Sequence, residues 1–205
     1  MTEKEKMLQG KIYDASDKEL VRLRGIAHRL SFEYNNTFED QEDKRKDILS
    51  KLLPDMGEGT YLQGPIQFDY GVFTKIGKRS YANFNLTILD CAPVTIGDNV
   101  FFGPNCTLAT PMHPYLPEER AMYDNGDGVL RDKEYAKPIC IGNDCWIAAN
   151  VVVCGGVTIG DGCVIGAGSV VTRDIPSGVI AAGNPCKVIR EITEKDSIYT
   201  KEELL

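Results

Sequence analysis

Hydrophobic positions recur every six residues along the stretch 141–176. The first position of each six is always a branched aliphatic residue: Ile141, Ile147, Val153, Ile159, Ile165 and Val171. The fifth position is small or aliphatic: Cys145, Val151, Val157, Cys163, Ser169 and Ile175. Neither helical spacing nor the simple alternation of a strand gives a six-residue register. The period predicts a mainly β fold, a parallel β-helix of hexapeptide repeats, because one coil cannot bury its own face and several must stack.

The other repeated position is the second of each six, which is usually Gly or Ala. We expect this residue near a tight corner, where little or no Cβ is favoured. The glycines are then explained by the repeat, and the chain has no P-loop or dinucleotide-binding fingerprint. Ser169 occupies an inward fifth position and lies in no nucleophile elbow.

The period is weaker upstream and then stops. Two registers offset by two residues contain the inward positions Ile76, Ala82, Ile88 and Val94, then Ile96, Phe102 and Leu108. The stretch from Thr110 to Lys137 is polar, charged and broken by Pro and Gly. We expect a loop extruded from the β-helix over about residues 109–138, and loops of this length in compact domains are usually functional or disordered.

The segments before and after the repeats differ from them. Ser16 to Glu19 matches a capping box, followed by apolar residues at helical spacing, and Thr37 to Asp40 is expected to open a second helix that ends before Pro54. The sequence therefore predicts a helical N-terminal cap at 1–55. It predicts a β-helix domain at 56–190, whose first irregular coil is 56–75, and a tail or short helix at 191–205.

Composition and charge restrict the function. The chain has 205 residues and a net charge of −7, which disfavours nucleic acid and anionic membranes as partners. No apolar run approaches the length of a membrane span, and the N-terminus is charged rather than signal-like. Seven scattered cysteines indicate reduced thiols in the cytoplasm rather than a disulfide framework.

The two histidines have different surroundings. His113 lies between Pro111 and Pro114 at the start of the expected loop, where a stiffened backbone suits a general base. Spacing alone is equally compatible with a loop histidine that has no role. His28 lies in the first expected helix with no reactive residues near it in sequence, which favours a structural role. One such histidine and no Cys-x-x-Cys pair make a zinc site within one chain unexpected, so we predict that no metal is required.

An ordered set of motifs is similar to the maltose/galactoside O-acetyltransferases, a family of hexapeptide-repeat acyltransferases. The motifs are 81–85 (YANFN), 96–99 (IGDN), 113–114 (HP), 134–139 (EYAKPI), 141–147 (IGNDCWI) and 182–185 (AGNP). Residues 10–13 and the expected helices resemble that family's N-terminal cap, so the similarity covers about residues 5 to 192.

The resemblance implies a left-handed β-helix, a homotrimer with active sites between subunits, and acetyl-CoA as donor. His113 matches the catalytic histidine, and Asn83 matches an acceptor-site asparagine. Galactoside enzymes have serine at the position of Asp69 and aspartate at that of Cys91, and either Asp14 or Asp17 lies near the family's N-terminal acceptor aspartate. Glu134 is expected to orient the imidazole through its other nitrogen.

The resemblance also implies a donor site. The backbone N–H of Ala149 matches a thioester contact, and Ala167 matches a pantetheine contact. Positive charge is kept where the family binds CoA, at Arg173 after Thr172, at Lys187 and at Arg190, although a solvated surface is the alternative. Trp146 either flanks the CoA arm or packs between coils.

The expected function is therefore direct acetyl transfer to a sugar or glycoside hydroxyl. His113 would act as general base, and the Ala149 N–H would stabilise the oxyanion. The alternatives are a related acetyltransferase acting on an antibiotic, an amino sugar or serine, and a non-catalytic β-helix that only binds. A β-helix carbonic anhydrase would need several metal-binding histidines that this chain lacks.

Overall fold

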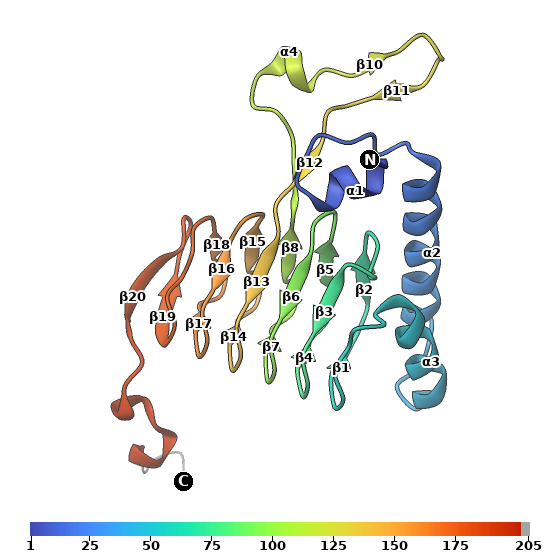
Figure 1. Ribbon diagram of the computed structural model, residues 1–205. Helices are drawn as coiled ribbons and strands as arrows, with labels where there is room; N and C mark the ends of the chain where they lie inside the picture. The colour runs from blue at the N-terminus through green and yellow to red at the C-terminus, as the bar shows by residue number, and fades with distance from the viewer. Residues whose placement is uncertain (202–205) are drawn as a thin grey trace.

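The computed structural model describes residues 1–201 and contains three N-terminal helices beside a parallel β-helix, which confirms the hexapeptide prediction (Figure 1). The helices are α1 (Glu3–Leu8), α2 (Lys18–Asn35) and α3 (Glu42–Leu52). Strands of successive coils pair in parallel to form three long sheets. No helix of the described residues is long and apolar enough to cross a membrane.

We number the three sheets in the order in which a coil visits them. Sheet I contains β3 (Thr74–Ile76), β6 (Val94–Ile96), β13 (Ile139–Ile141) and β16 (Thr158–Ile159). Sheet II contains β1 (Tyr61–Leu62), β4 (Tyr81–Ala82), β7 (Phe101–Phe102), β14 (Trp146–Ile147), β17 (Val164–Ile165), β19 (Val179–Ala182) and β20 (Lys187–Glu191). Sheet III contains β2 (Ile66–Phe68), β5 (Leu86–Leu89), β8 (Thr107–Ala109), β15 (Val152–Cys154) and β18 (Val170–Val171).

Each coil therefore has three corners, and two of these matter for function. The II–III corner follows sheet II and contains residues 83–85, 103–106, 148–151 and 166–169. The III–I corner follows sheet III and contains residues 69–73, 90–93, 110–138, 155–157 and 172–174. The same corner recurs in successive coils, so residues distant in sequence form a column along one edge.

The interior is filled by the repeat as predicted. All first and fifth positions of the hexads are buried, and Ile165, Cys163 and Ser169 have no exposed surface. The second-position glycines are needed for lack of space and not for backbone conformation, because they are not in the left-handed region. A Cβ at Gly97 would lie 2.7 Å from the carbonyl carbon of Gly142 in the next coil, so close stacking excludes a side chain there. The left-handed conformation occurs two residues later, for example at Asp144 and Gly162.

Asparagine also takes this left-handed corner conformation, and its side chain joins the coils. Asn85, Asn105 and Asn150 stack at the II–III corner with φ of 62°, 61° and 59°. The Asn85 amide donates to the Asn105 side chain at 2.8 Å, and the Asn105 amide donates to that of Asn150 at 3.1 Å. Each asparagine thus adds a side-chain hydrogen bond between neighbouring coils, which a glycine in the same left-handed conformation could not make.

The helical cap covers the first coils but begins and ends at residues that differ from the predicted ones. Asp17, not Ser16, caps α2, since its carboxylate accepts from the N–H groups of Glu19 and Leu20. The second predicted helix begins at Glu42 after Gln41 rather than at Thr37, and α1 was not predicted. Arg45 of α3 closes the open edge of the first coil by donating to the carbonyls of Leu62 and Gln63 at 2.7 and 3.0 Å.

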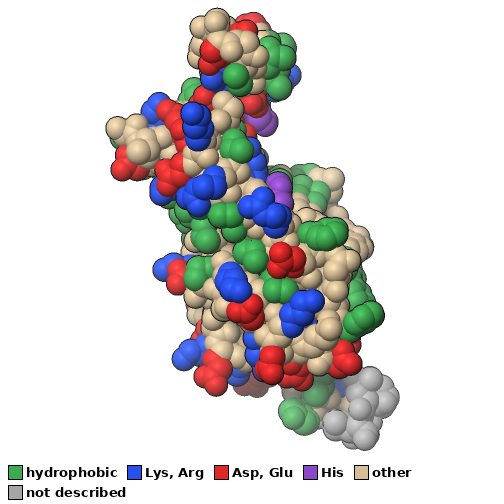
Figure 2. All heavy atoms as spheres, turned by 90° about the vertical axis from the view of Figure 1, so that its right-hand side faces the viewer, with side chains coloured by type: hydrophobic (Ala, Val, Ile, Leu, Met, Phe, Trp, Pro, Cys, Tyr) green, Lys and Arg blue, Asp and Glu red, His purple; other side chains and the backbone are tan. Residues whose placement is uncertain are grey.

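The extruded loop leaves after β8 and returns before β13, as predicted, but it has structure of its own. It contains β9 (Pro111–Met112), α4 (Pro117–Arg120), β10 (Tyr123–Asp124), β11 (Leu130–Arg131) and β12 (Tyr135–Ala136). The hairpin of β10 and β11 projects away from the body (Figures 1 and 2). At the other end, β19 and β20 form an antiparallel hairpin, followed by the 3-10 turns η1 (Glu194–Asp196) and η2 (Ile198–Thr200). The rest of the predicted tail, 202–205, lies outside the described residues.

Candidate active site

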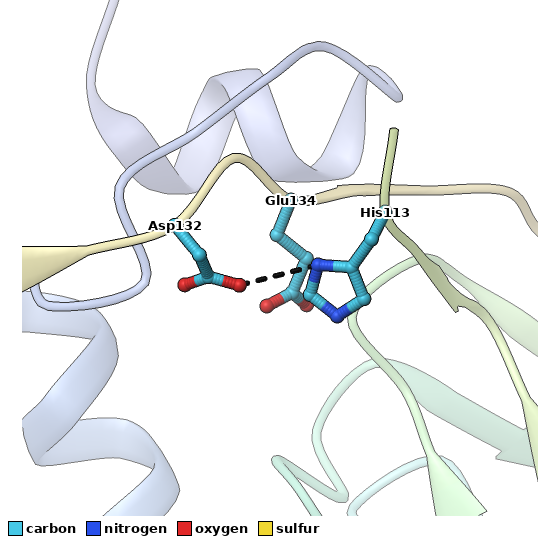
Figure 3. Close-up of side chains that lie close together, drawn as sticks. All are labelled: His113, Asp132 and Glu134. Atoms are coloured by element: carbon cyan, nitrogen blue, oxygen red, sulfur yellow. Dashed lines mark ion pairs between the residues drawn. The ribbon is translucent and has the colours of Figure 1, made fainter. Parts of the chain in front are cut away.

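The base of the extruded loop is a short antiparallel ribbon that brings His113 and Glu134 together. Met112 of β9 pairs with Tyr135 of β12, so the adjacent residues His113 and Glu134 lie opposite each other. Asp132, two residues before Glu134, points to the same side of the strand. The potential ligand atoms of His113, Asp132 and Glu134 all lie within 4.8 Å of one another (Figure 3).

Asp132 rather than Glu134 approaches the imidazole. The Nδ1 atom of His113 lies 3.2 Å from Oδ2 of Asp132 and 3.2 Å from the carbonyl oxygen of Lys133. A carboxylate and a carbonyl both accept hydrogen bonds, so this geometry favours the tautomer in which Nδ1 is the donor. We expected Glu134 to orient the imidazole. The structure instead places the carboxylate of Asp132 next to Nδ1.

Glu134 is held instead by the N-terminal cap. The hydroxyl of Tyr13 donates to the Glu134 carboxylate, and the Tyr13 N–H donates to the Glu134 carbonyl at 3.1 Å. Burial raises the pKa of the Tyr13 phenol well above its usual value, and the neighbouring Cys91 and Glu134 add to the shift. Tyr13 therefore remains a hydrogen-bond donor, and it fixes the ribbon to the body of the molecule.

The III–I corner beneath the loop carries two further predicted site residues and one that sequence reasoning missed. Cys91 Sγ lies 3.5 Å from Oδ2 of Asp69, and His28 Nε2 lies 3.8 Å from Oδ1 of the same carboxylate. His28 is exposed, so the structural role expected for it is that of a surface residue. The pKa of Cys91 is raised by burial, and the charges of Asp69 and Glu134 also contribute, so this thiol stays protonated.

The two N-terminal aspartates have different environments. Asp17 caps α2, whereas Oδ2 of Asp14 accepts from Nε of Arg131 at 2.7 Å and Oδ1 accepts from Ser16. Partial burial acts to raise the pKa of Asp14, but hydrogen bonds from Ser16 and Arg131 outweigh it, and the pKa lies below its usual value. The structure thus places Asp14, and not Asp17, next to the ribbon.

The predicted thioester and pantetheine contacts lie at the other corner, together with the predicted acceptor-site residue Asn83. Asn83, Ala149 and Ala167 belong to the II–III corner, and a pocket there is lined by Tyr81, Asn83, Phe101, Phe102, Gly103 and Trp146. Among residues 1–201, the backbone N–H groups of Ala149 and Ala167 donate to no acceptor. Trp146 is 54 % exposed, so it does not pack between coils.

The basic residues near the C-terminus are exposed. Thr172 and Arg173 lie at the III–I corner, and Lys187 lies in β20. Arg190 of β20 is paired with Asp196 of η1 at 2.6 Å, an ion pair that a phosphate would have to displace or share. Their assignment to the CoA phosphates stays a prediction.

Besides His28, three residues were missed, and only one of them had a local signal. Asp132 shares a strand face with Glu134 by two-residue spacing, but its pairing with His113 depends on the register across a loop of about twenty residues. Arg131 and Tyr13 make contacts more than one hundred residues away in sequence, which no local pattern predicts.

Comparison with known proteins agrees with this architecture. Residues 6–57 match the maltose acetyltransferase hexapeptide capping motif, 93–111 the hexapeptide repeat of succinyl-transferase, and 141–173 the bacterial transferase hexapeptide repeats. The galactoside O-acetyltransferase of Escherichia coli K12 is 43 % identical over 95 % of this chain and 92 % of its own.

Two solved structures are similarly close. A maltose O-acetyltransferase from Clostridium difficile 630 has 43 % identity and a TM-score of 0.86, covering 95 % of this chain and 99 % of its own. A galactoside acetyltransferase in complex with coenzyme A has 43 % identity and a TM-score of 0.87, covering 96 % and 94 %.

The fold and the repeats define a hexapeptide-repeat acyltransferase. Within that class, the chain belongs to the maltose/galactoside O-acetyltransferase family.

Proposed function

We propose that this enzyme transfers acetyl from acetyl-CoA to a hydroxyl of a sugar or glycoside, with His113 as the general base. The observation that carries the proposal is the hydrogen bonding of His113. Its Nδ1 faces Asp132 and the Lys133 carbonyl, so Nε2 is the free basic atom, and the side chain is 43 % exposed. Family membership and relatives solved with coenzyme A or acetyl-CoA support the donor.

The transfer is a single displacement. Nε2 of His113 takes the proton of the acceptor hydroxyl as its oxygen attacks the thioester carbon. The carbonyl electrons move to oxygen and then return, expelling the CoA thiolate, which recovers the proton from the imidazolium. The undonated N–H of Ala149 is the group we assign to the oxyanion, since preorganised donors are worth about 100- to 1,000-fold.

The predicted site residues occupy two different corners of the β-helix, which supports a site between copies of the chain. His113, Asp69 and Cys91 share the III–I corner, whereas Asn83 and Ala149 share the II–III corner. We propose a homotrimer in which the III–I corner of one subunit faces the II–III corner of its neighbour. Asn83 then orients the acceptor held against the neighbour's His113.

An outward aromatic row supports such an assembly. Tyr61, Tyr81, Phe101 and Trp146 are directly paired across consecutive strands of sheet II. Phe101 is 52 % and Trp146 54 % exposed. An exposed apolar row of this size commonly marks an interface or a ligand groove.

The III–I corner suits a polar acceptor. Asp69 and His28 are partly exposed next to the ribbon, and Asp14 lies beside it. Carboxylate and imidazole groups bind sugar hydroxyls through charge-assisted hydrogen bonds. The excess of carboxylates also favours an amino sugar as a second candidate acceptor, because its ammonium group would be attracted. We propose a cytoplasmic location, which fits the seven cysteines, all of which are free.

The test is CoA-thiol release from acetyl-CoA over a panel of maltose, glucose, galactosides, glucosamine, serine and chloramphenicol, with His113→Ala alongside. We expect release with a sugar and a loss of at least about 100-fold in kcat for His113→Ala, because general-base catalysis is typically worth 100- to 10,000-fold. Gel filtration checks that the variant keeps its assembly. A loss of only a few-fold would remove His113 from the central role, and release with chloramphenicol or serine alone would replace the sugar.

A further inference from the structure

The imidazole of His113 is oriented by residues about twenty positions later in the chain. Nδ1 has two acceptors, one from a side chain and one from the backbone, both at 3.2 Å and both from the returning strand of the loop. The Asp132 side chain is only 29 % exposed, which makes its charge more effective than that of a fully solvated carboxylate. Lys133 contributes its backbone carbonyl, which no substitution removes. The contact with Asp132 is made by a side chain and can be removed by mutation.

The residue that precedes Asp132, Arg131, is anchored on two sides. The Arg131 side chain is 13 % exposed, and its Nε donates to Asp14 at 2.7 Å. Its Nη1 and Nη2 donate to the two carboxylate oxygens of Asp127 at 2.8 and 2.7 Å, a bidentate pair. Nη1 also donates to the Val129 carbonyl at 3.0 Å. The guanidinium thus joins the β10–β11 hairpin to the N-terminal cap one residue before Asp132.

The cap end of this connection is also fixed. The Asp14 N–H donates to the Glu3 carboxylate at 2.7 Å, and its Oδ1 accepts from the Ser16 N–H and hydroxyl at 2.9 and 2.6 Å. Hydrogen bonds therefore run from α1 through Asp14 to Arg131, which directly precedes Asp132 in the chain.

We propose that Asp132 is the positioning residue of His113, and that the Asp14–Arg131 pair holds Asp132 for that task. The inference rests on the proposed function, in which Nε2 is the base. Asp132 touches neither acceptor nor donor. It keeps the proton on Nδ1, directs the lone pair of Nε2 towards the acceptor, and stabilises the imidazolium formed when Nε2 takes the hydroxyl proton.

The kinetic test compares Asp132→Ala, Asp132→Asn and Asp132→Glu. We expect Asp132→Ala to lower kcat about 10- to 100-fold with little change in the KM for acetyl-CoA, since the Lys133 carbonyl retains part of the orientation. Asp132→Asn keeps an acceptor without the charge, so it should fall between Ala and wild type, and Asp132→Glu should recover part of the loss. Arg131→Met should lower kcat by a smaller factor. Glu118→Ala, an exposed carboxylate of α4 in the same loop, is the matched control and should match wild type.

The decisive readout does not depend on activity. The chain has only two histidines, so ¹⁵N-histidine NMR gives two sets of ring signals, and His28→Gln assigns them. We expect neutral His113 in the Nδ1–H form in wild type and a shift towards the Nε2–H form in Asp132→Ala. An unchanged tautomer in Asp132→Ala overturns the proposal, even if kcat falls. A shifted tautomer with unchanged kcat also overturns the positioning role. A wild-type enzyme that transfers no acetyl would instead refute the proposed function, whatever the tautomer.

Discussion

The coils of the β-helix and the extruded loop stabilise themselves in opposite ways. In the coils several polar corner residues pair with their counterparts in the next coil, as Asn85 does with Asn105. In the loop the polar residues pair across the chain, as Tyr13 does with Glu134 and Asp14 with Arg131. The repeat makes a rigid edge with equivalent positions, and the loop places unlike groups together. Chemistry that needs one base and one orienting carboxylate belongs to the second kind of region.

The largest expected effect is a loss of stability from a substitution in the core of the coils, away from the loop. Ile165→Ala removes a fully buried inward residue and should lower the free energy of unfolding by about 2–5 kcal/mol, because a large-to-small change in a packed core leaves a cavity. Val164→Ala changes the adjacent, outward residue and should cost less than about 1 kcal/mol. Denaturant unfolding of both variants measures the difference. Equal losses would show that inward and outward positions are not distinct.

A smaller effect on the KM for acetyl-CoA tests the role of the exposed basic residues. Arg173→Gln and Lys187→Gln should each raise the KM for acetyl-CoA about 3- to 10-fold with kcat little changed, because phosphate contacts bind ground state and transition state alike. The KM of wild type should rise with salt more steeply than that of either variant. Lys195→Gln, in η1, is the control and should leave the KM unaltered. An unchanged KM for Arg173→Gln or Lys187→Gln would assign that residue to a solvated surface.

The smallest expected effect is that of metal removal, which should leave the activity unchanged. His113, Asp132 and Glu134 are residue types that bind divalent metals, and their potential ligand atoms lie within 4.8 Å of one another. If they act as a hydrogen-bonded group, EDTA followed by desalting should leave kcat within the error of the assay. Loss of activity on chelation, restored by zinc or manganese, would make the ribbon a metal site instead.

The sequence predicts the coils well because their period is local. Ile141 and its equivalents are assigned inward from spacing alone, and all are buried. The reason for the corner glycines needed the structure, since only stacked coils show that Gly97 lacks room for a Cβ. Helix boundaries failed by a few residues where two capping residues compete, as at Ser16 and Asp17.

The site was predicted in part. The position of His113 at the base of a loop followed from the end of the repeat and its flanking prolines. Its partner Asp132 did not, because the returning segment of the loop contacts Tyr13 and Asp14, which are remote in sequence. The contact of His28 with Asp69 was missed for the same reason, since the two residues meet only in the folded chain. Roles for Asn83, Ala149 and the basic residues remain predictions.

The central claim is that one active site uses the loop corner of one subunit and the opposite corner of its neighbour. The most direct measurement mixes His113→Ala and Asn83→Ala subunits, each nearly inactive alone, by co-refolding or co-expression in equal amounts. If the site lies between subunits, random mixed trimers contain intact sites from two chains, and activity should return to about one quarter of wild type. If mixing restores no activity above that of the parents, His113 and Asn83 do not form a shared site, and the account is contradicted.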